Sequence, residues 1–147
     1  MNNNEKKATN LSLKSLVVLS RTNHAVMEHI KKDIRSHGLG VTEFAVLELL
    51  YHKGEQPTQR IGEQILITSG SITYVVDKLE AKGYLERKRC PEDRRVIYAH
   101  ISDKGRALMD EIFPEHSKSI EAMFQNLTNE EKETLIVLLK KVGLAQS

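Results

Sequence analysis

Hydrophobic residues recur at helical spacing along most of the chain, and they alternate at strand spacing in one region beyond its middle. The first helix is predicted over residues 11–37, where Leu13, Leu16 and Val17 begin a stripe that no Pro or Gly interrupts. Gly38 follows, a residue type that tolerates positive φ and commonly ends a helix. Such a helix is long for a small domain, so we expect it to act as an arm in association between chains.

Two shorter helices are predicted next. Thr42 is expected to cap a helix whose residues 44–50 are hydrophobic on almost every side, so this helix should be buried. Pro57 begins the following unit, and Thr58 is expected to cap its short helix. That helix is the first half of a helix-turn-helix predicted over residues 58–83.

The second helix of this motif follows a brief turn, has a serine cap at its start and ends at Gly83. Its hydrophobic residues fall at i, i+3, i+4 and i+7, which makes a narrow stripe for packing inward. The inward stripe consists of Ile72, Val75, Val76 and Leu79, and the outward side and flanks carry Gly70, Thr73, Tyr74, Asp77 and Lys78.

A β-hairpin is predicted directly after the helix-turn-helix. Residues 85–89 and 96–101 have the alternation and composition of strands. Between them, Pro91 fixes φ and Asp93 can bond the nearby backbone, as expected of a turn. The hairpin, residues 85–102, therefore stands where a winged-helix protein has its wing.

Two helices complete the chain. Ser102 is predicted to start a helix that runs to the mid-120s, with Pro114 kinking or splitting it. Thr128 and Glu131 form a capping-box pattern at the start of the last helix, whose hydrophobic stripe consists of Leu135, Leu138, Leu139 and Val142. The elements together predict a mainly α (α+β) fold: a winged helix-turn-helix domain over residues 11–144, with long helices at both ends.

Composition narrows the function further. The 147 residues include 22 Lys and Arg against 20 Asp and Glu, a net charge of +2, so a DNA-binding surface must come from local clustering of cations. The single cysteine, Cys90, fits a reducing cytoplasm. Residues 1–10 lack the apolar run of a signal peptide, and we expect them to be a disordered tail. No apolar stretch approaches membrane-spanning length, so no membrane partner is expected.

The helix-turn-helix and the wing supply the candidates for DNA contact. A major groove accepts one helix, whose outward side chains reach base edges or phosphates. The wing has five cations within nine residues, and an arginine at its tip can enter the minor groove. Asp93 is placed to hold Arg95 in an extended pose. The candidate DNA-binding residues are Thr58, Arg60, Ser69, Ser71, Thr73, Tyr74, Lys78, Lys88, Asp93, Arg94 and Arg95.

Each of these elements also has a plainer interpretation. An amphipathic helix commonly has a polar face that is simply solvated. A run of mixed charges is usually a solvated β-turn. The order of a helix-turn-helix followed at once by a basic wing favours the DNA-binding interpretation over both.

The chain resembles the MarR family of winged-helix transcriptional regulators over nearly its whole length. The resemblance is carried by TEFAVLELL at residues 42–50, by SGSITYVVDKLEAKGYLERKRCPEDRRV at residues 69–96 and by ISDKG at residues 101–105. It implies a homodimer, with residues 11–37 and 115–144 forming the dimer interface.

The same resemblance implies a role for the wing. Members of the family bind a pseudo-palindromic operator in double-stranded DNA, usually as repressors, with the recognition helix in the major groove. By position, Arg95 corresponds to the wing-tip residue that enters the minor groove, and Asp93 corresponds to its orienting partner.

The resemblance also implies a release signal. Similar regulators leave DNA when a small aromatic or phenolic molecule binds or when a cysteine is oxidised, and the chain is similar to the quinone- or aromatic-responsive branch. Cys90 is a possible redox or electrophile sensor, since cations such as Arg89 and Arg94 favour the reactive thiolate. The alternative is a surface cysteine without a role.

Other classes of function find little support. The six histidines include no i, i+4 pair on one helix, so no metal site is predicted, and no cofactor is expected. No phosphate-binding loop, nucleophile elbow or zinc-protease motif occurs, so the chain is not expected to be an enzyme. Two alternatives stay open: a non-DNA-binding helical dimer acting as a protein-interaction module, and a transcriptional activator.

Overall fold

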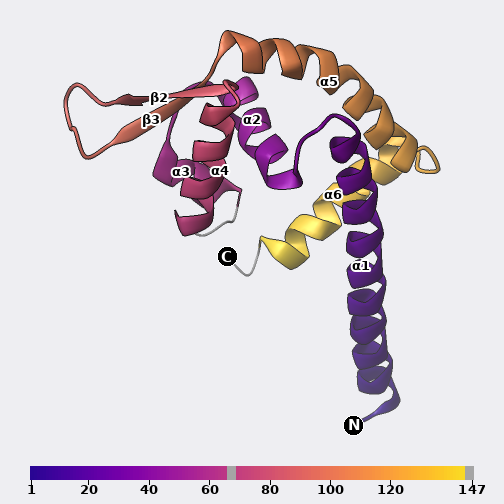
Figure 1. Ribbon diagram of the computed structural model, residues 1–147. Coiled ribbons are helices and arrows are strands. Elements are labelled where there is room, and N and C mark those ends of the chain that lie inside the picture. The colour runs from indigo at the N-terminus through magenta and orange to yellow at the C-terminus, as the bar shows by residue number, and fades with distance from the viewer. Residues whose placement is uncertain (66–68, 145–147) are drawn as a thin grey trace. The chain divides into compact units, whose positions relative to one another are not determined.

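The computed structural model describes residues 1–65 and 69–144. The chain forms two compact units, Met1–Ile112 and Phe113–Ser147. Their boundary lies inside the helix Asp103–Met123, whereas the sequence predicts one domain over residues 11–144. The elements in chain order are α1 (Asn3–Ser36), α2 (Val41–Lys53), β1 (Gln56–Pro57), α3 (Thr58–Gln64), α4 (Ser69–Ala81), β2 (Leu85–Arg89), β3 (Ile97–Ile101), α5 (Asp103–Met123) and α6 (Asn129–Gly143) (Figure 1).

The core of the first unit forms around α2. Val46, Leu47 and Leu50 of this helix are completely buried, and α2 contacts α1, α4 and β3. The near-continuous hydrophobic sequence of α2 thus predicts its burial correctly. Within the described residues of α1, burial is confined to Ile34 near the C-terminal end, so most of that long helix lies outside this core.

Three strands form one antiparallel sheet in the order β1-β3-β2. The hairpin matches the prediction closely: β2 has the predicted bounds, and Leu85 pairs with Ile101 and Arg89 with Ile97. Strand β1 was not expected, because two residues that include Pro57 resemble a turn in sequence. A proline lacks the amide that a central strand needs, and Pro57 accordingly lies in an edge strand beside β3.

The N-terminal residues are helical, so the prediction of a disordered tail over residues 1–10 is wrong for this structure. Helix α1 begins at Asn3, and the side chain of Asn2 accepts a hydrogen bond from the Glu5 amide at 2.8 Å. The Glu5 carboxylate accepts one from the Asn2 amide at 2.7 Å, which completes a capping box. The asparagine run that suggested disorder therefore supplies the helix cap.

Helix starts elsewhere differ from the prediction by one or two residues. Helix α2 has Gly40 at its N-cap position rather than Thr42, and the Glu43 carboxylate accepts a hydrogen bond from the Gly40 amide at 3.1 Å. Helix α3 has Pro57 at its N-cap position, with Thr58 as the first helical residue. In both cases the sequence has a threonine, a common N-cap residue, within two positions of the observed N-cap. The sequence alone does not show which of these residues has the backbone conformation of the N-cap.

The C-terminal helices follow the prediction with one difference. Helix α5 continues from Asp103 to Met123 through Pro114, so the proline does not split it. Its fixed φ is itself helical, and the loss of one backbone hydrogen bond does not end a helix of this length. At the start of α6, Thr128 and Glu131 form the predicted capping box.

Gly105 permits the close approach of α5 to the start of the wing. A Cβ at this position would lie 2.0 Å from the carbonyl oxygen of Tyr84, which also accepts a hydrogen bond from the Ser102 amide at 3.0 Å.

We expect Gly105→Ala to lower the free energy of unfolding by about 1–3 kcal/mol, since the backbone must move to make room for the methyl group. Urea denaturation measures this. Gly143→Ala is the control, because a Cβ there meets nothing within 4 Å; an equal loss in both variants would contradict the steric explanation.

Candidate DNA-binding site

Helices α3 and α4 and the wing belong to the same compact unit. Helix α4 contacts α2, α3 and β2. Figure 1 shows the β2–β3 hairpin extending well beyond the end of α4, with its turn far from the helices. The motif and the wing are therefore held together on one body.

Helix α4 has one buried face and one exposed face. Its predicted inward stripe is buried: Ile72, Val75, Val76 and Leu79 are at most 7% exposed. On the other side, Tyr74 is 67% exposed. Ser71 and Thr73 are also exposed on this surface, whereas the side chain of Ser69 lies outside the described part of the chain.

Lys78 lies at the edge of this face and is held by a buried carboxylate. Its ammonium nitrogen is 3.5 Å from a carboxylate oxygen of Glu43, whose other oxygen is 2.8 Å from the ammonium nitrogen of Lys82. Glu43 is only 6% exposed. The carboxylate joins α2 to α4 and holds Lys78 near the exposed surface, a contact that the helical projection of the sequence does not reveal.

This carboxylate gives a pH-dependent stability. Burial raises the pKa of Glu43, but the hydrogen bonds from Lys82 and the Gly40 amide and the charges of Lys82 and Lys78 outweigh it, so the pKa lies below its ordinary value. The pKa of Glu43 is lower in the folded state than in the unfolded state. The ionised carboxylate therefore contributes its full stabilisation at pH values above the unfolded-state pKa, and this stabilisation is lost as pH falls toward and through the folded-state pKa.

We expect urea unfolding midpoints to fall between about pH 6 and about pH 3, and to fall less steeply in Glu43→Gln. Other carboxylates titrate in both proteins, so the difference between the two slopes isolates Glu43. Identical slopes would show that Glu43 does not contribute.

At the wing tip, Asp93 and Arg95 form the predicted pair. The Arg95 guanidinium donates to the two Asp93 carboxylate oxygens at 3.1 and 3.3 Å, and its backbone amide donates to the first at 3.1 Å. These hydrogen bonds hold the pKa of Asp93 below its ordinary value. The Arg95 side chain is nevertheless 91% exposed, so the pair holds the arginine in place without covering it.

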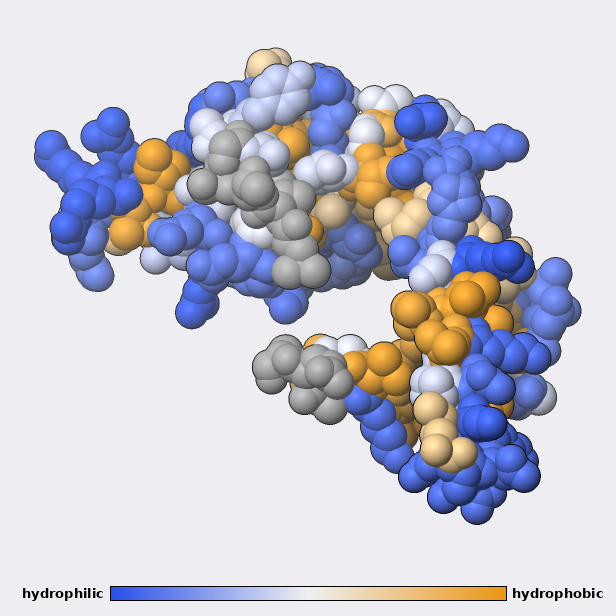
Figure 2. All heavy atoms as spheres, turned by 90° about the horizontal axis from the view of Figure 1, so that it is seen from below, coloured by the Kyte–Doolittle hydropathy of each residue, from blue (hydrophilic) through white to orange (hydrophobic). Residues whose placement is uncertain are grey.

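The remaining cations of the wing divide into two groups. Lys88, Arg89 and Arg94 are exposed, and Figure 2 shows the outer end of the wing as hydrophilic, with a hydrophobic patch beside it on the hairpin. Arg87 instead turns back to α4, where it bonds Asp77 and Glu80. The hydrogen bond from Arg87 also holds the pKa of Glu80 below its ordinary value. In the first half of the motif, Arg60 is exposed and Thr58 is half-buried.

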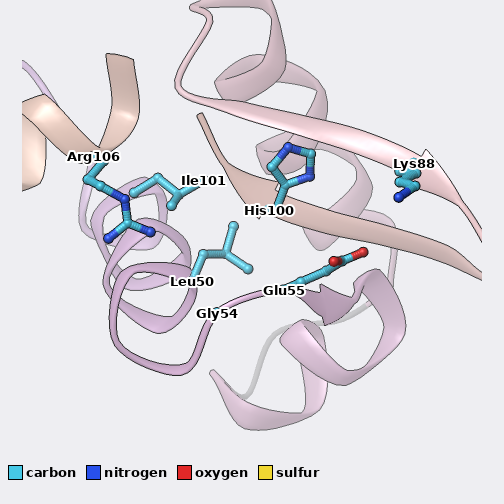
Figure 3. Close-up of a pocket in the computed structure, with 7 residues that line it drawn as sticks. All are labelled: Leu50, Gly54, Glu55, Lys88, His100, Ile101 and Arg106. Carbon is cyan, nitrogen blue, oxygen red and sulfur yellow. The ribbon is translucent and has the colours of Figure 1, made fainter. Parts of the chain in front are cut away.

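Two cavities adjoin the wing. One, of about 330 Å³, is lined by Leu50, Gly54, Glu55, Lys88, His100, Ile101 and Arg106 (Figure 3). Its volume is at the lower end of small-molecule sites, but those are mainly apolar, and this lining is mostly charged or polar. The other, of about 360 Å³, is lined in part by Cys90 and Tyr98. Cys90 itself is half-buried, so the thiol is less open than a turn position suggests.

A helix-turn-helix with an exposed outer face, followed by a basic antiparallel hairpin with an arginine at its tip, defines a winged helix-turn-helix DNA-binding protein. The model of the MarR family matches residues 39–97. Over 136 residues the chain is 55% identical to the HTH-type transcriptional regulator MhqR of Bacillus subtilis, covering 92% of this chain and 94% of that protein. The chain belongs to the MarR family of transcriptional regulators, and it is not an enzyme.

Further relatives agree. An uncharacterised HTH-type transcriptional regulator of Bacillus subtilis, YkoM, is 48% identical over 86% of this chain and 82% of its own length. A solved structure of an Escherichia coli MarR mutant with operator DNA superposes with a TM-score of 0.81 at 21% identity, covering 91% of this chain and 96% of that one. At that identity the structural likeness shows the fold. None of the helices in the described residues combines the length and apolar character that a membrane crossing requires.

Proposed function

We propose that the protein is a dimeric repressor that binds a pseudo-palindromic operator, with α4 in the major groove and Arg95 in the minor groove. The observation that carries this proposal is the Asp93–Arg95 pair, which leaves the Arg95 side chain 91% exposed at the end of a thin hairpin. The minor groove has a negative potential and admits an arginine more readily than a helix. Tyr74 and Lys78, on the exposed side of α4, are the major-groove candidates.

The proposed dimer is supported by two hydrophobic surfaces on the end helices. Monomeric proteins rarely expose large continuous hydrophobic surfaces. Figure 2 shows hydrophobic residues gathered along the exposed surface of α6. The exposed set comprises Leu11, Leu13, Leu16, Val17, Val18 and Leu19 in α1 and Ile136, Val137, Leu138, Leu139 and Val142 in α6, each at least 40% exposed. We assign both surfaces to the interface between two copies of the chain.

A selection of genomic DNA tests the proposed function. Fragments retained by the protein are sequenced, and the affinity for an enriched fragment is measured by filter binding at several salt concentrations. We expect a common inverted repeat, with log affinity falling linearly against log salt as counterions are released. Retention of fragments without a shared sequence would refute operator recognition.

We further propose that a small aromatic or phenolic molecule, or an electrophile acting at Cys90, releases the operator, and that the protein acts in the cytoplasm. Solved structures of similar fold include NadR in complex with 4-hydroxyphenylacetate, at 22% identity and a TM-score of 0.74. Thermal-shift screening of phenols, quinones and salicylates on wild-type protein and Cys90→Ser separates the two routes. Stabilisation kept in the variant supports a pocket, and stabilisation lost supports the thiol; a screen without any response refutes both.

A further inference from the structure

Arg87 is bound to the recognition helix by all of its guanidinium nitrogens. Nη1 lies 2.7 Å from a carboxylate oxygen of Asp77, Nη2 donates to Glu80 Oε1 at 2.9 Å, and Nε donates to Glu80 Oε2 at 3.2 Å. The Arg87 backbone amide also donates to Glu80 Oε2, at 3.1 Å. This set of contacts, which we call the wing clamp, consists of Arg87, Asp77 and Glu80.

The wing clamp changes the charge of the surface that faces DNA in the proposed function. Asp77 and Glu80 are acidic residues of α4, and their side chains are 54% and 39% exposed. Carboxylates on a recognition helix repel phosphates. Arg87, which is 30% exposed, lies against both and neutralises one of the two charges. An arginine used in this way is no longer extended toward a phosphate.

The wing clamp also lies near the base of the wing, between β2 and α4, where it affects the orientation of the wing. Strand β2 follows α4 after a short turn at Gly83, which has a φ of +81°. Leu85 is the buried residue of β2, with the other four exposed, so the hydrophobic anchor lies at the base of the strand. Arg87 holds the strand two residues closer to the tip. A small rotation about the base displaces Arg95, at the far end of the hairpin, by much more.

We propose that Arg87 is a positioning residue for DNA binding. It fixes the wing against α4, so that the recognition helix and Arg95 meet one DNA duplex in register, and it makes no DNA contact itself. The assignment rests on the proposed function, since it concerns the affinity for an operator. Exposed ion pairs contribute little to stability, so variants of the wing clamp are expected to fold.

Two variants distinguish positioning from a direct phosphate contact. Glu80→Ala removes a negative charge from α4, which by charge alone raises affinity for DNA; we expect it to lower operator affinity by about 5- to 20-fold, which lies within the range of coupling between residues of one ion-pair network. Arg87→Lys keeps the positive charge but loses the forked geometry, and we expect a similar loss. Arg89→Lys, an exposed arginine on the same strand, is the matched control and should change affinity by less than about 2-fold.

A readout without DNA completes the test. A nitroxide attached to Cys90, the single cysteine of the chain, reports motion of the wing by electron paramagnetic resonance. We expect the spectrum to show greater mobility in Glu80→Ala and Arg87→Lys than in wild type, together with the affinity losses. Unchanged mobility, or wild-type operator affinity in either variant, would overturn the assignment. Wild-type protein that bound no operator would instead refute the proposed function, and the positioning role with it, whatever the probe reported.

Discussion

Replacing Arg95 with alanine is expected to lower the affinity for the operator by about 10- to 100-fold, or about 1–3 kcal/mol. The Arg95 side chain is 91% exposed, and its guanidinium is already oriented by two hydrogen bonds to Asp93. An oriented arginine loses little conformational freedom when it enters the minor groove, so much of the electrostatic attraction appears as affinity. Fluorescence anisotropy with a labelled operator measures the change.

Two further variants make the result specific. Lys32→Ala removes an exposed cation from α1, outside the helix-turn-helix and the wing, and should leave affinity within about 2-fold of wild type. Asp93→Ala removes a negative charge from the wing yet should weaken binding, because Arg95 loses its orienting partner. Unchanged affinity in Arg95→Ala would contradict the assignment of the wing tip to the minor groove.

A glutamate in place of Leu139 is expected to convert the proposed dimer to a monomer. Leu139 is 43% exposed in the isolated chain and belongs to the hydrophobic surface of α6. Burying an unpaired carboxylate in the interface costs far more than the lost leucine contact. Because each half-site is then bound independently, operator affinity should fall by about 100-fold or more. Analytical ultracentrifugation measures the mass, and anisotropy measures the affinity.

Lys140→Glu is the control for this variant. It introduces the same side chain in the next residue of α6, on the side of the helix away from the stripe of Leu135, Leu138, Leu139 and Val142, and should leave the protein dimeric. A dimer that persists in Leu139→Glu at micromolar concentration would show that the interface lies elsewhere.

The sequence predicts helix α4 and the wing hairpin well because their signals are local. The stripe from Ile72 to Leu79 depends on spacing within one helix, and all four of its residues are buried. The bounds of β2 follow from alternation and from the turn beside Pro91. The Asp93–Arg95 contact spans only two residues, so it is visible in the sequence as a D-x-R step.

Features that depend on contacts between residues far apart in the sequence were not predicted. Strand β1 exists because Gln56 meets Ala99, and two residues carry no periodicity of their own. Lys78 was predicted as a flank residue of its helix and a candidate for DNA contact, while its ion pair with Glu43, which joins two helices, was not predicted. Arg87 is one of the five wing cations in the sequence, but its ion pairs with Asp77 and Glu80 depend on the turn between α4 and β2. Such contacts are determined by tertiary packing.

The most direct test of the central claim is a footprint of the wild-type protein on the operator obtained by genomic selection. A dimer that inserts α4 and Arg95 of both copies should protect two half-sites on one face of the DNA, with centres about one helical turn, roughly 10–10.5 base pairs, apart or a multiple of this. Protection should extend into the flanking minor grooves and disappear there in Arg95→Ala. Protection of a single half-site, or of no defined sequence, would contradict the account.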